Sequence, residues 1–275
     1  MEAVVQHYAG GHDLVARALE LLRAAGKDVE RLTIDDLAGL DEFHVRGRDA
    51  TLSLAARLAL RGDERVLDVG SGIGGPARRL AALHPGIDVT GIDLTPEFCR
   101  LANELSRRVG LAARVRFEIA DATRLPFADA AFDVAWTQHV QMNIADKPAF
   151  YGEIARVLKP GGRFAFYDIL QGPGRAIRYP APWAADASQS HVVTPEAMQQ
   201  LVADAGLVVE QWVDVTAAGR DWAAKRAANP PAPGAIWTGA LLGDAIRSGS
   251  ANIPRNLDEG RIALVEAIAR KPARP

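Results

Sequence analysis

Cysteine is almost absent from this chain of 275 residues, and several other features are missing with it. The single Cys99 cannot form an internal disulfide, and six scattered histidines lack the ligand spacing of a zinc site, so we expect no bound metal. The sequence also lacks a long apolar run, and its first residues, MEAVVQHYAGG, carry no basic leader or cleavage pattern. These absences predict a protein of a reducing compartment, most simply the cytoplasm, without membrane association.

An excess of charge of one sign is missing as well. Lysine and arginine number 32 against 34 acidic residues, which gives a formal net charge of -2 at pH 7. The basic residues are scattered among acidic ones and form no stripe, so we expect no nucleic acid partner. The length suits one domain with room for a lid, and 48% hydrophobic residues suffice for a sizeable core. Composition leaves open whether the protein is a monomer or a homodimer.

The N-terminal part of the chain is predicted to be helical. Apolar residues fall on one helical face from Asp13 to Ala25, Gly26 is a stop signal, and a second helix is expected from Asp49 to Leu60. We expect these helices to form an N-terminal cap over residues 1–61.

From Arg65 onward, short apolar runs alternate with amphipathic segments, as in parallel strands joined by crossover helices. The runs are RVLDVG, IDVTGID, RVRFEIAD, FDVAWT, GRFAFYDIL, LVVEQWVDV and RIALVEAIAR. Thr95 is expected to cap the helix after the second run. This pattern predicts an α/β, Rossmann-like fold with a mostly parallel sheet and helices on both faces.

The rest of the domain organisation follows from composition. Residues 62–170 are expected to form the core, and the Pro- and Gly-rich residues 171–193 to form a lid-like insertion. Residues 194–275 are expected to complete the sheet and to carry a helical insertion. This insertion has helical material at 221–228, the breaker NPPAPG and a helix at 236–247.

A glycine-rich turn lies within RVLDVGSGIGGPARRLA, between a predicted strand and a predicted helix. Gly70, Gly72 and Gly75 satisfy the GxGxxG spacing of nucleotide-binding turns, which is weak evidence when taken alone. Asp68 precedes the turn, and strand alternation directs its carboxylate toward the ligand crevice. A buried carboxylate disfavours an approaching phosphate, whereas an ammonium or sulfonium group would stabilise it.

Two more carboxylates follow the next two strands. Asp93 ends the second strand about twenty residues beyond the turn, where it can accept hydrogen bonds from both hydroxyls of a ribose. Asp121 follows the third strand, where it can accept from an adenine amine. Apolar walls for that base are expected from Ile73, Leu94, Ala122 and Phe127.

Together these features describe a ligand with an adenosine, a positive centre and no phosphate, and S-adenosylmethionine fits that description. In the alternative interpretation the three aspartates are only turn or capping residues.

The chain here resembles the class I S-adenosylmethionine-dependent methyltransferases. Five segments match the successive motifs of that family between Arg65 and Asp168: VLDVGSGIGG, VTGIDL, DATRLPF, FDVAWT and RVLKPGGRFAFYD. The resemblance implies a seven-stranded sheet whose last strand is antiparallel, with the cofactor's methionine end at Gly70 and Gly72. The predicted cofactor-binding residues are Asp68, Gly70, Ser71, Gly72, Gly74, Asp93, Leu94, Asp121, Ala122, Thr137 and Gln138.

Within that family, WTQHVQMNIADK and LDEFHVRG resemble small-molecule enzymes such as sarcosine and dimethylglycine N-methyltransferases and natural-product sugar O-methyltransferases. Tyr8 is a candidate to fold over the cofactor, as in related enzymes. Cys99 lies in the middle of a predicted helix and is expected to pack in the core.

The acceptor side is expected around TQHVQMNI, directly after the fourth strand. His139 is the candidate base or orienting group, since the ordinary pKa of histidine lies near neutrality. The alternative is that His139 only hydrogen-bonds its own loop. The predicted substrate-contacting residues are His44, Arg46, Met142, Asn143, Trp183 and His191, with Arg46 or Arg178 as the partner of an acceptor's carboxylate.

We interpret the sequence as a methyltransferase that transfers a methyl group from S-adenosylmethionine to nitrogen or oxygen of a small polar metabolite or natural product and leaves S-adenosylhomocysteine. Two other classes remain as alternatives. One is an NAD-dependent oxidoreductase, which shares the glycine turn, and the other is a non-catalytic module that binds S-adenosylmethionine.

Overall fold

The computed structural model describes residues 13–229 and 235–273. Its strands are β1 (Arg65–Val69), β2 (Asp88–Asp93), β3 (Val115–Ile119), β4 (Phe132–Gln138), β5 (Leu158–Gln171), β6 (Val208–Asp214) and β7 (Ile262–Arg270). Its helices are α2 (Leu14–Ala24), α3 (Ile34–Asp41), α4 (Arg48–Leu58), α5 (Gly75–Leu83), α6 (Pro96–Arg108), α7 (Lys147–Val157), α8 (Pro195–Asp204), α9 (Thr216–Ala228), α10 (Thr238–Leu242), α11 (Asp244–Ala251) and α12 (Ile253–Asp258). Short 3-10 turns are η1 (Gln141–Asn143) and η2 (Ala187–Gln189).

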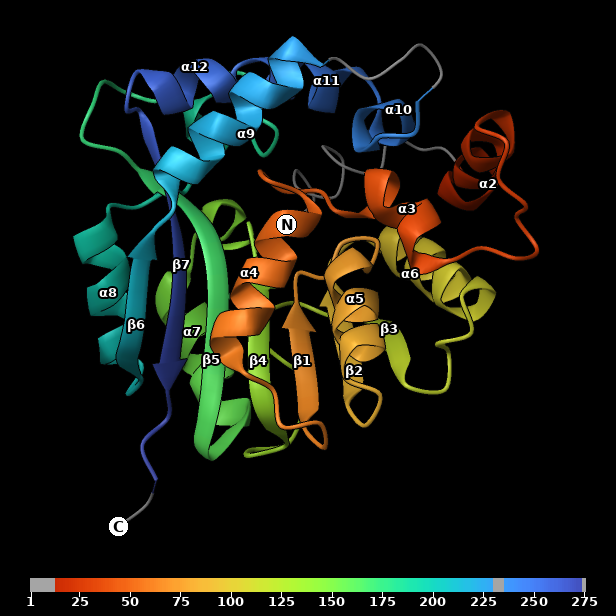
Figure 1. Ribbon diagram of the computed structural model, residues 1–275. Helices are drawn as coiled ribbons and strands as arrows, with labels where there is room; N and C mark the ends of the chain where they lie inside the picture. The colour runs from red at the N-terminus through yellow and green to blue at the C-terminus, as the bar shows by residue number, and fades with distance from the viewer. Residues whose placement is uncertain (1–12, 230–234, 274–275) are drawn as a thin grey trace.

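The strands form one seven-stranded sheet in the order β3-β2-β1-β4-β5-β7-β6, with helices on both faces (Figure 1). The pairs among β1 to β5 are parallel, whereas β7 is antiparallel to both β5 and β6. This confirms the predicted Rossmann-like sheet and its antiparallel last strand. Parallel strands bring their carboxyl ends to one edge of the sheet, where ligands of such folds bind.

Alternating strand residues divide the core into two layers. Val66, Val134 and Trp136 belong to the layer that packs against α4, α5 and α6. Leu67 and Phe166 belong to the opposite layer, which packs against α7 and α8. Cys99 lies buried in the first layer, as predicted.

A third apolar cluster joins the N-terminal cap to the far end of the chain. It contains Leu19 of α2, Leu37 of α3 and Leu101 of α6, together with Leu241 of α10. The cap helices begin at well-formed N-caps. Asp13 accepts hydrogen bonds from the second and third amides of α2, and Thr33 forms a capping box at the start of α3. The cap therefore lies beside the C-terminal helices, close to the carboxyl edge of the sheet.

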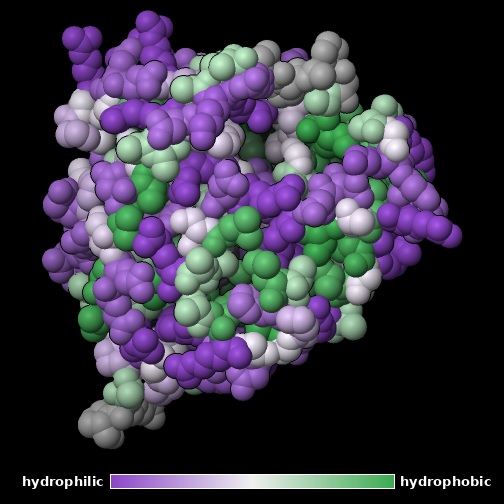
Figure 2. All heavy atoms as spheres, in the orientation of Figure 1, coloured by the Kyte–Doolittle hydropathy of each residue, from purple (hydrophilic) through white to green (hydrophobic). Residues whose placement is uncertain are grey.

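The connection between β6 and β7 carries α9 to α12, which we call the roof. Because β7 is antiparallel to β6, this connection leaves and re-enters the sheet at the carboxyl edge of the parallel strands. Figure 1 shows α9, α11 and α12 extending above that edge. The visible side of these upper helices is largely hydrophilic (Figure 2), whereas their apolar residues Ala223, Ile246 and Leu257 are buried.

Several local expectations were wrong. Helices α3 and α12 were not expected, and α9 begins at Thr216, five residues before the predicted start. The single helix predicted for 236–247 is two helices, because Gly243 adopts a φ of 88° and interrupts it. Thr95 does occupy the N-cap position of α6, but its side chain makes no capping hydrogen bond there.

Other expectations stay predictions. The domain boundaries are among them, and Tyr8 and most of the NPPAPG segment lie outside the described residues. Within the described part of the chain, no helix has both the length and the apolar character needed to cross a membrane.

One buried charge cluster joins the cap to the last strand. Glu266 of β7 is fully buried and receives hydrogen bonds from Arg46 at 2.6 Å, Arg57 at 2.7 Å and Ser53 at 2.8 Å. Removing one partner of a buried ion pair leaves the others without compensation, which is costly. This cluster therefore anchors α4, and the loop before it, to the sheet.

We expect Glu266→Ala to lower the free energy of unfolding by about 3 to 5 kcal/mol, because two arginines lose their buried partner. Urea unfolding followed by circular dichroism measures the loss. Glu210→Ala, which removes a partly exposed ion pair with Arg270, is the matched control and should cost less than about 1 kcal/mol. Equal losses in the two variants would contradict an anchoring role for Glu266.

Candidate active site

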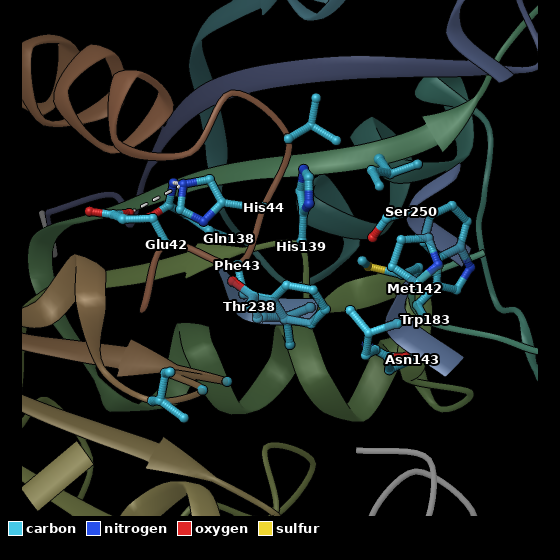
Figure 3. A pocket seen from close by; sticks show the side chains of 18 of the residues that line it. Glu42, Phe43, His44, Gln138, His139, Met142, Asn143, Trp183, Thr238 and Ser250 are labelled. Carbon is cyan, nitrogen blue, oxygen red and sulfur yellow. Dashed lines mark hydrogen bonds and ion pairs between the residues drawn. The ribbon is translucent and has the colours of Figure 1, made fainter. Parts of the chain in front are cut away.

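A cavity of about 1750 Å³ lies at the carboxyl edge of the parallel strands. Its walls come from the glycine loop (Gly70–Gly75), the cap, the loop after β4, residues 182–191 and the roof. Figure 3 shows His139 between two groups of side chains, with Glu42, His44 and Gln138 on one side and Met142, Asn143 and Trp183 on the other. Ligand sites of drug size usually enclose roughly 300 to 1,000 Å³, so this cavity has room for more than one small molecule.

The glycine loop exposes its backbone to one end of the cavity. Gly70 and Gly72 have φ values of 72° and 54°, in the left-handed region that glycine tolerates best. A Cβ on Gly70 would lie 2.5 Å from Val140 Cγ2, whereas the space beside Gly72 is open. Gly70, Ser71, Gly72 and Ile73 all line the cavity. A ligand can therefore approach the main chain closely at this point.

Asp68 lies beneath this loop at the end of β1. Its side chain is buried, and Oδ2 has no hydrogen-bond partner among the described residues. Burial, with the nearby carboxylates of Asp93 and Glu42, raises the pKa of Asp68 to about 8. An unpartnered buried carboxyl beside a cavity is suited to a cationic ligand.

Asp93 and Asp121 line the same end of the cavity, as predicted, so the three acids lie at successive strand ends. Asp93 accepts backbone hydrogen bonds from Gly72 and Thr95, each at 2.9 Å, and burial raises its pKa. Asp121 accepts from the amide and hydroxyl of Thr123 at 2.8 and 2.7 Å. Each oxygen has two lone pairs, so both carboxylates can accept further hydrogen bonds from a ligand. Leu94 and Ala122 add apolar surface beside them.

Three residues predicted to contact the cofactor lie outside the cavity lining. Gly74 is outside the cavity lining, and a Cβ there would lie 2.3 Å from the Phe117 ring, so packing requires this glycine. Thr137 is fully buried on the sheet face opposite to Trp136 and Gln138, and only Gln138 lines the cavity. Phe127 is partly buried and packs edge-on against Phe132 of the core, with ring centroids 5.0 Å apart.

The cap reaches the glycine loop through Arg78, which is fully buried. Its Nη2 donates to Asp41 Oδ2 at 2.7 Å and also to the carbonyl of Ile73. Gly75 permits this approach, because a Cβ on it would lie 2.1 Å from the carbonyl oxygen of Asp41. One guanidinium thus holds both α3 and the glycine loop.

His139 lines the middle of the cavity from the loop after β4. Its φ of 55° is uncommon for a residue with a side chain, and its amide donates to the Tyr167 carbonyl at 2.8 Å. The imidazole lies against the Tyr167 ring, with centroids 4.6 Å apart, and Nε2 has no partner among the described residues. Burial, with the nearby His44, lowers the pKa of His139 well below its ordinary value. The ring is therefore neutral near pH 7, and it makes no loop hydrogen bond of the kind the alternative interpretation requires.

His44 belongs to a buried polar network that the sequence did not indicate. Its Nε2 lies 2.9 Å from the Gly47 carbonyl and 3.5 Å from Glu42 Oε2. Glu42 accepts from the Thr51 hydroxyl at 2.8 Å. Burial lowers the pKa of His44 to about 4, and burial together with Asp41 raises the pKa of Glu42 to about 7. His44 is thus held by the protein at the cavity wall.

The two candidate carboxylate-binding arginines differ from expectation. Arg46 lines the cavity, but its guanidinium already pairs with Glu266. Arg178 is not part of the lining, and its backbone is held by the side chain of Asn256. That placement contradicts Arg178 as a direct substrate contact, while the role of Arg46 stays a prediction.

The other predicted acceptor residues lie together on the far side of His139. Met142, Asn143, Trp183 and His191 all line the cavity. Trp183 is buried and donates from Nε1 to Ser190 Oγ at 2.9 Å, and the amide of His191 donates to the Met142 carbonyl at 2.8 Å. Residues 182–191 are therefore docked on the loop that carries His139.

The roof supplies lining residues that the sequence reasoning missed. Among them are Trp222 and Arg226 of α9, Trp237 and Thr238 near α10, and Ile246 of α11. The only sequence signal was the presence of two tryptophans and several apolar residues in a segment otherwise rich in breakers. These residues meet at the cavity because β7 is antiparallel to β6, which places the connection between the two strands at the carboxyl edge of the sheet.

Comparison with known proteins gives a consistent result. Residues 67–166 match the family model described as a methyltransferase domain. The chain is 36% identical over 190 residues to a 27-O-demethylrifamycin SV methyltransferase of Amycolatopsis mediterranei, covering 66% of each chain. It is 38% identical over 159 residues to the methyltransferase GfsG of Streptomyces halstedii, covering 58% of this chain and 57% of that one. The chain thus spans less than two thirds of the length of these relatives.

Among solved structures, the fold is similar to that of the [4+2]-cyclase SpnF. The TM-score is 0.66 at 27% sequence identity, and the alignment covers 95% of this chain and 94% of that chain. The similarity therefore includes the cap and the roof as well as residues 67–166.

We expect Asp68→Asn to become more stable, relative to the parent protein, as the pH rises. An unfolded aspartate loses its proton near its ordinary pKa of 3.8, whereas folded Asp68 keeps it up to about pH 8. The stabilisation by this proton is complete below pH 4 and is lost as the pH rises through 8. The difference in the free energy of unfolding should therefore change by a few kcal/mol, at up to about 1.4 kcal/mol per pH unit.

Urea unfolding of both proteins at pH 5 and pH 8.5 measures this change. Asp258→Asn, at an exposed position at the end of α12, is the control and should show no such dependence. A constant difference between Asp68→Asn and the parent protein would show that Asp68 titrates normally.

Proposed function

Residues 67–166 match the methyltransferase domain model, and on that premise we propose that the chain transfers a methyl group from S-adenosylmethionine to oxygen or nitrogen of a small molecule. One observation carries the proposal. Asp68, Asp93 and Asp121 line one end of the cavity beside a bare glycine loop, and Asp68 keeps an unpartnered buried oxygen there. Such a site favours a cationic nucleoside over a dinucleotide with its two phosphates. We therefore do not propose an NAD-dependent oxidoreductase.

The residues at the acidic end of the cavity would each bind a different part of S-adenosylmethionine. Asp68 would accept hydrogen bonds from the ammonium group, Asp93 from the ribose hydroxyls and Asp121 from the adenine amine, with Leu94 and Ala122 against the base. When bound, S-adenosylmethionine supplies a methyl group on a positively charged sulfur, which is the electrophile of the reaction. Its product would be S-adenosylhomocysteine.

His139 is the group best placed to act on the acceptor. It lies between the acidic end and the roofed part of the cavity, and its lowered pKa keeps the imidazole free to accept a proton near neutral pH. A hydroxyl acceptor must lose its proton as the new O–C bond forms, so Nδ1 or Nε2 of His139 would receive it. An amine attacks in its neutral form and loses a proton afterwards, so it depends less on this base. Met142, Asn143, Trp183 and His191 would surround the acceptor.

A second candidate function is favoured by the similarity to the [4+2]-cyclase over 95% of this chain. A cyclisation in the roofed part of the cavity would need enclosure and positioning rather than methyl transfer. The two functions differ in one product, because only methyl transfer converts S-adenosylmethionine into S-adenosylhomocysteine.

The remaining assignments rest on the sequence. A monomer or homodimer in the cytoplasm, without a nucleic acid partner, agrees with the balanced charge and the single buried cysteine.

We expect S-adenosylhomocysteine to bind far more tightly than NAD in isothermal titration calorimetry. Asp68→Asn should weaken its binding by at least about tenfold, the effect of losing one hydrogen bond to a charged group. At pH 7 Asp68 is largely protonated, so binding of an ammonium group should release up to one proton. The observed enthalpy should then depend on the ionisation enthalpy of the buffer in the parent protein, and less so in the variant. Preferential binding of NAD would overturn the proposed function.

We expect His139→Gln to lower kcat for a hydroxyl acceptor by about 10² to 10⁴, with little change in the affinity for S-adenosylhomocysteine. Host-cell extract with labelled S-adenosylmethionine supplies the acceptor and identifies the product. His84→Gln, at the end of α5 and outside the cavity, is the control. The kcat of the parent protein should stay constant from pH 6.5 to 8 and fall only at lower pH, because the pKa of His139 is lowered. Unchanged turnover in His139→Gln would show that His139 is not the general base.

A further inference from the structure

The two halves of the cavity differ in charge. The half beside the glycine loop contains Asp68, Asp93 and Asp121. In contrast, the described lining residues from 182–191 and from the roof include no acidic residue, although they include Arg226 and Arg247. The wall formed by residues 182–191 and the roof, which bounds the roofed half of the cavity, is therefore basic, while the end beside the glycine loop is acidic. A cation is favoured at one end and disfavoured at the other.

The roofed half is also largely apolar. Trp183, Trp222, Trp237, Ile246 and Ile253 all contribute to its wall. Indole and aliphatic side chains provide the contact area that holds the body of a ligand, and polar groups set its orientation. A cavity of about 1750 Å³ leaves considerable space here beyond an S-adenosylmethionine-sized ligand.

Arg226 is the notable polar group of this half. Its guanidinium carbon lies 5.5 Å from the centroid of Trp222 and 6.0 Å from that of Trp237, so the cation is held against two indoles. No described carboxylate pairs with it. Arg247, by comparison, pairs with Asp244. Stacking uses the face of a guanidinium and leaves its N–H groups at the edge for an oxyanion.

We propose that the roofed half binds an amphiphilic anion, whose apolar body lies against the tryptophans and whose oxyanion pairs with Arg226. The proposal rests on the proposed function only in treating this half as the acceptor site. It also resolves which arginine serves an acidic acceptor, because Arg46 is occupied by Glu266 and Arg178 lies outside the cavity. Carboxylate, phosphate and sulfonate share the chemistry that Arg226 recognises.

Two fluorescent probes test this directly. 8-Anilinonaphthalene-1-sulfonate and N-phenyl-1-naphthylamine share one aromatic body, and only the first carries an anion. We expect the sulfonate to bind the parent protein about tenfold more tightly than the amine, because a charge-assisted contact adds to the same apolar contacts. Arg226→Gln should abolish this preference by weakening sulfonate binding alone, and Arg226→Lys should restore part of it.

Lys225→Gln is the matched control, since Lys225 is an exposed neighbour on α9 that does not line the cavity. Urea transitions of all variants should coincide, which excludes dye binding to partly unfolded protein. Displacement of the sulfonate dye by 1-naphthoate, 1-naphthyl phosphate or 1-naphthamide then identifies the preferred oxyanion, with the amide expected to be weakest.

The proposal is overturned if the sulfonate fails to bind, if both probes bind equally, or if Arg226→Gln leaves their ratio unchanged. Competition between the sulfonate and S-adenosylhomocysteine would also overturn it, because it would place the anion in the acidic half. Failure of S-adenosylhomocysteine to bind would instead contradict the proposed function, and the ratio of the two probes would still decide this inference.

Discussion

Asp68 lies buried at the end of β1 with an oxygen that has no hydrogen-bond partner among the described residues, and the carboxylates of Asp93 and Glu42 act on it more strongly than the guanidinium of Arg78. Burying a carboxylate in such surroundings is unfavourable unless a cation joins it or a proton stays on it. In the free protein the proton fulfils this role, which is why the pKa of Asp68 rises to about 8. The bare backbone at Gly72 then leaves space for a ligand that can replace the proton with its own positive charge.

The roofed half of the cavity depends on the direction of one strand. Because β7 enters the sheet antiparallel to β6, the connection between them is confined to the edge where the parallel strands end. Any helices inserted there must cover the cavity, as α9 to α12 do. Residues 67–166, which match the methyltransferase domain model, contain Asp68, Asp93 and Asp121 of the acidic half, and the connection between β6 and β7 lines the other half. Substitutions in the roof can therefore alter this half of the cavity without replacing Asp68, Asp93 or Asp121.

Local sequence patterns predicted the sheet, the glycine loop and the three acids, because strand alternation and turn chemistry depend only on near neighbours. They failed where distant segments decide. Gly74 is required by Phe117 on another strand, and Arg46 is paired with a carboxylate 220 residues away. The network of Glu42 and His44 was missed for the same reason, since nothing in LDEFHVRG indicates which of its polar residues become buried. Thr137 is a different case, because alternation along β4 already places it on the face opposite to Gln138.

Arg78 connects two parts of the molecule that otherwise have separate tasks. Its single guanidinium bonds Asp41 of the cap and the Ile73 carbonyl of the glycine loop, in a region that is closed to solvent. Breaking either contact costs a buried hydrogen bond of this guanidinium, so the local stabilities of α3 and of the loop are coupled through one side chain. A ligand that orders the loop therefore slows exchange of the α3 amides with solvent. Binding at the glycine loop stabilises the cap as well, because Arg78 bonds both.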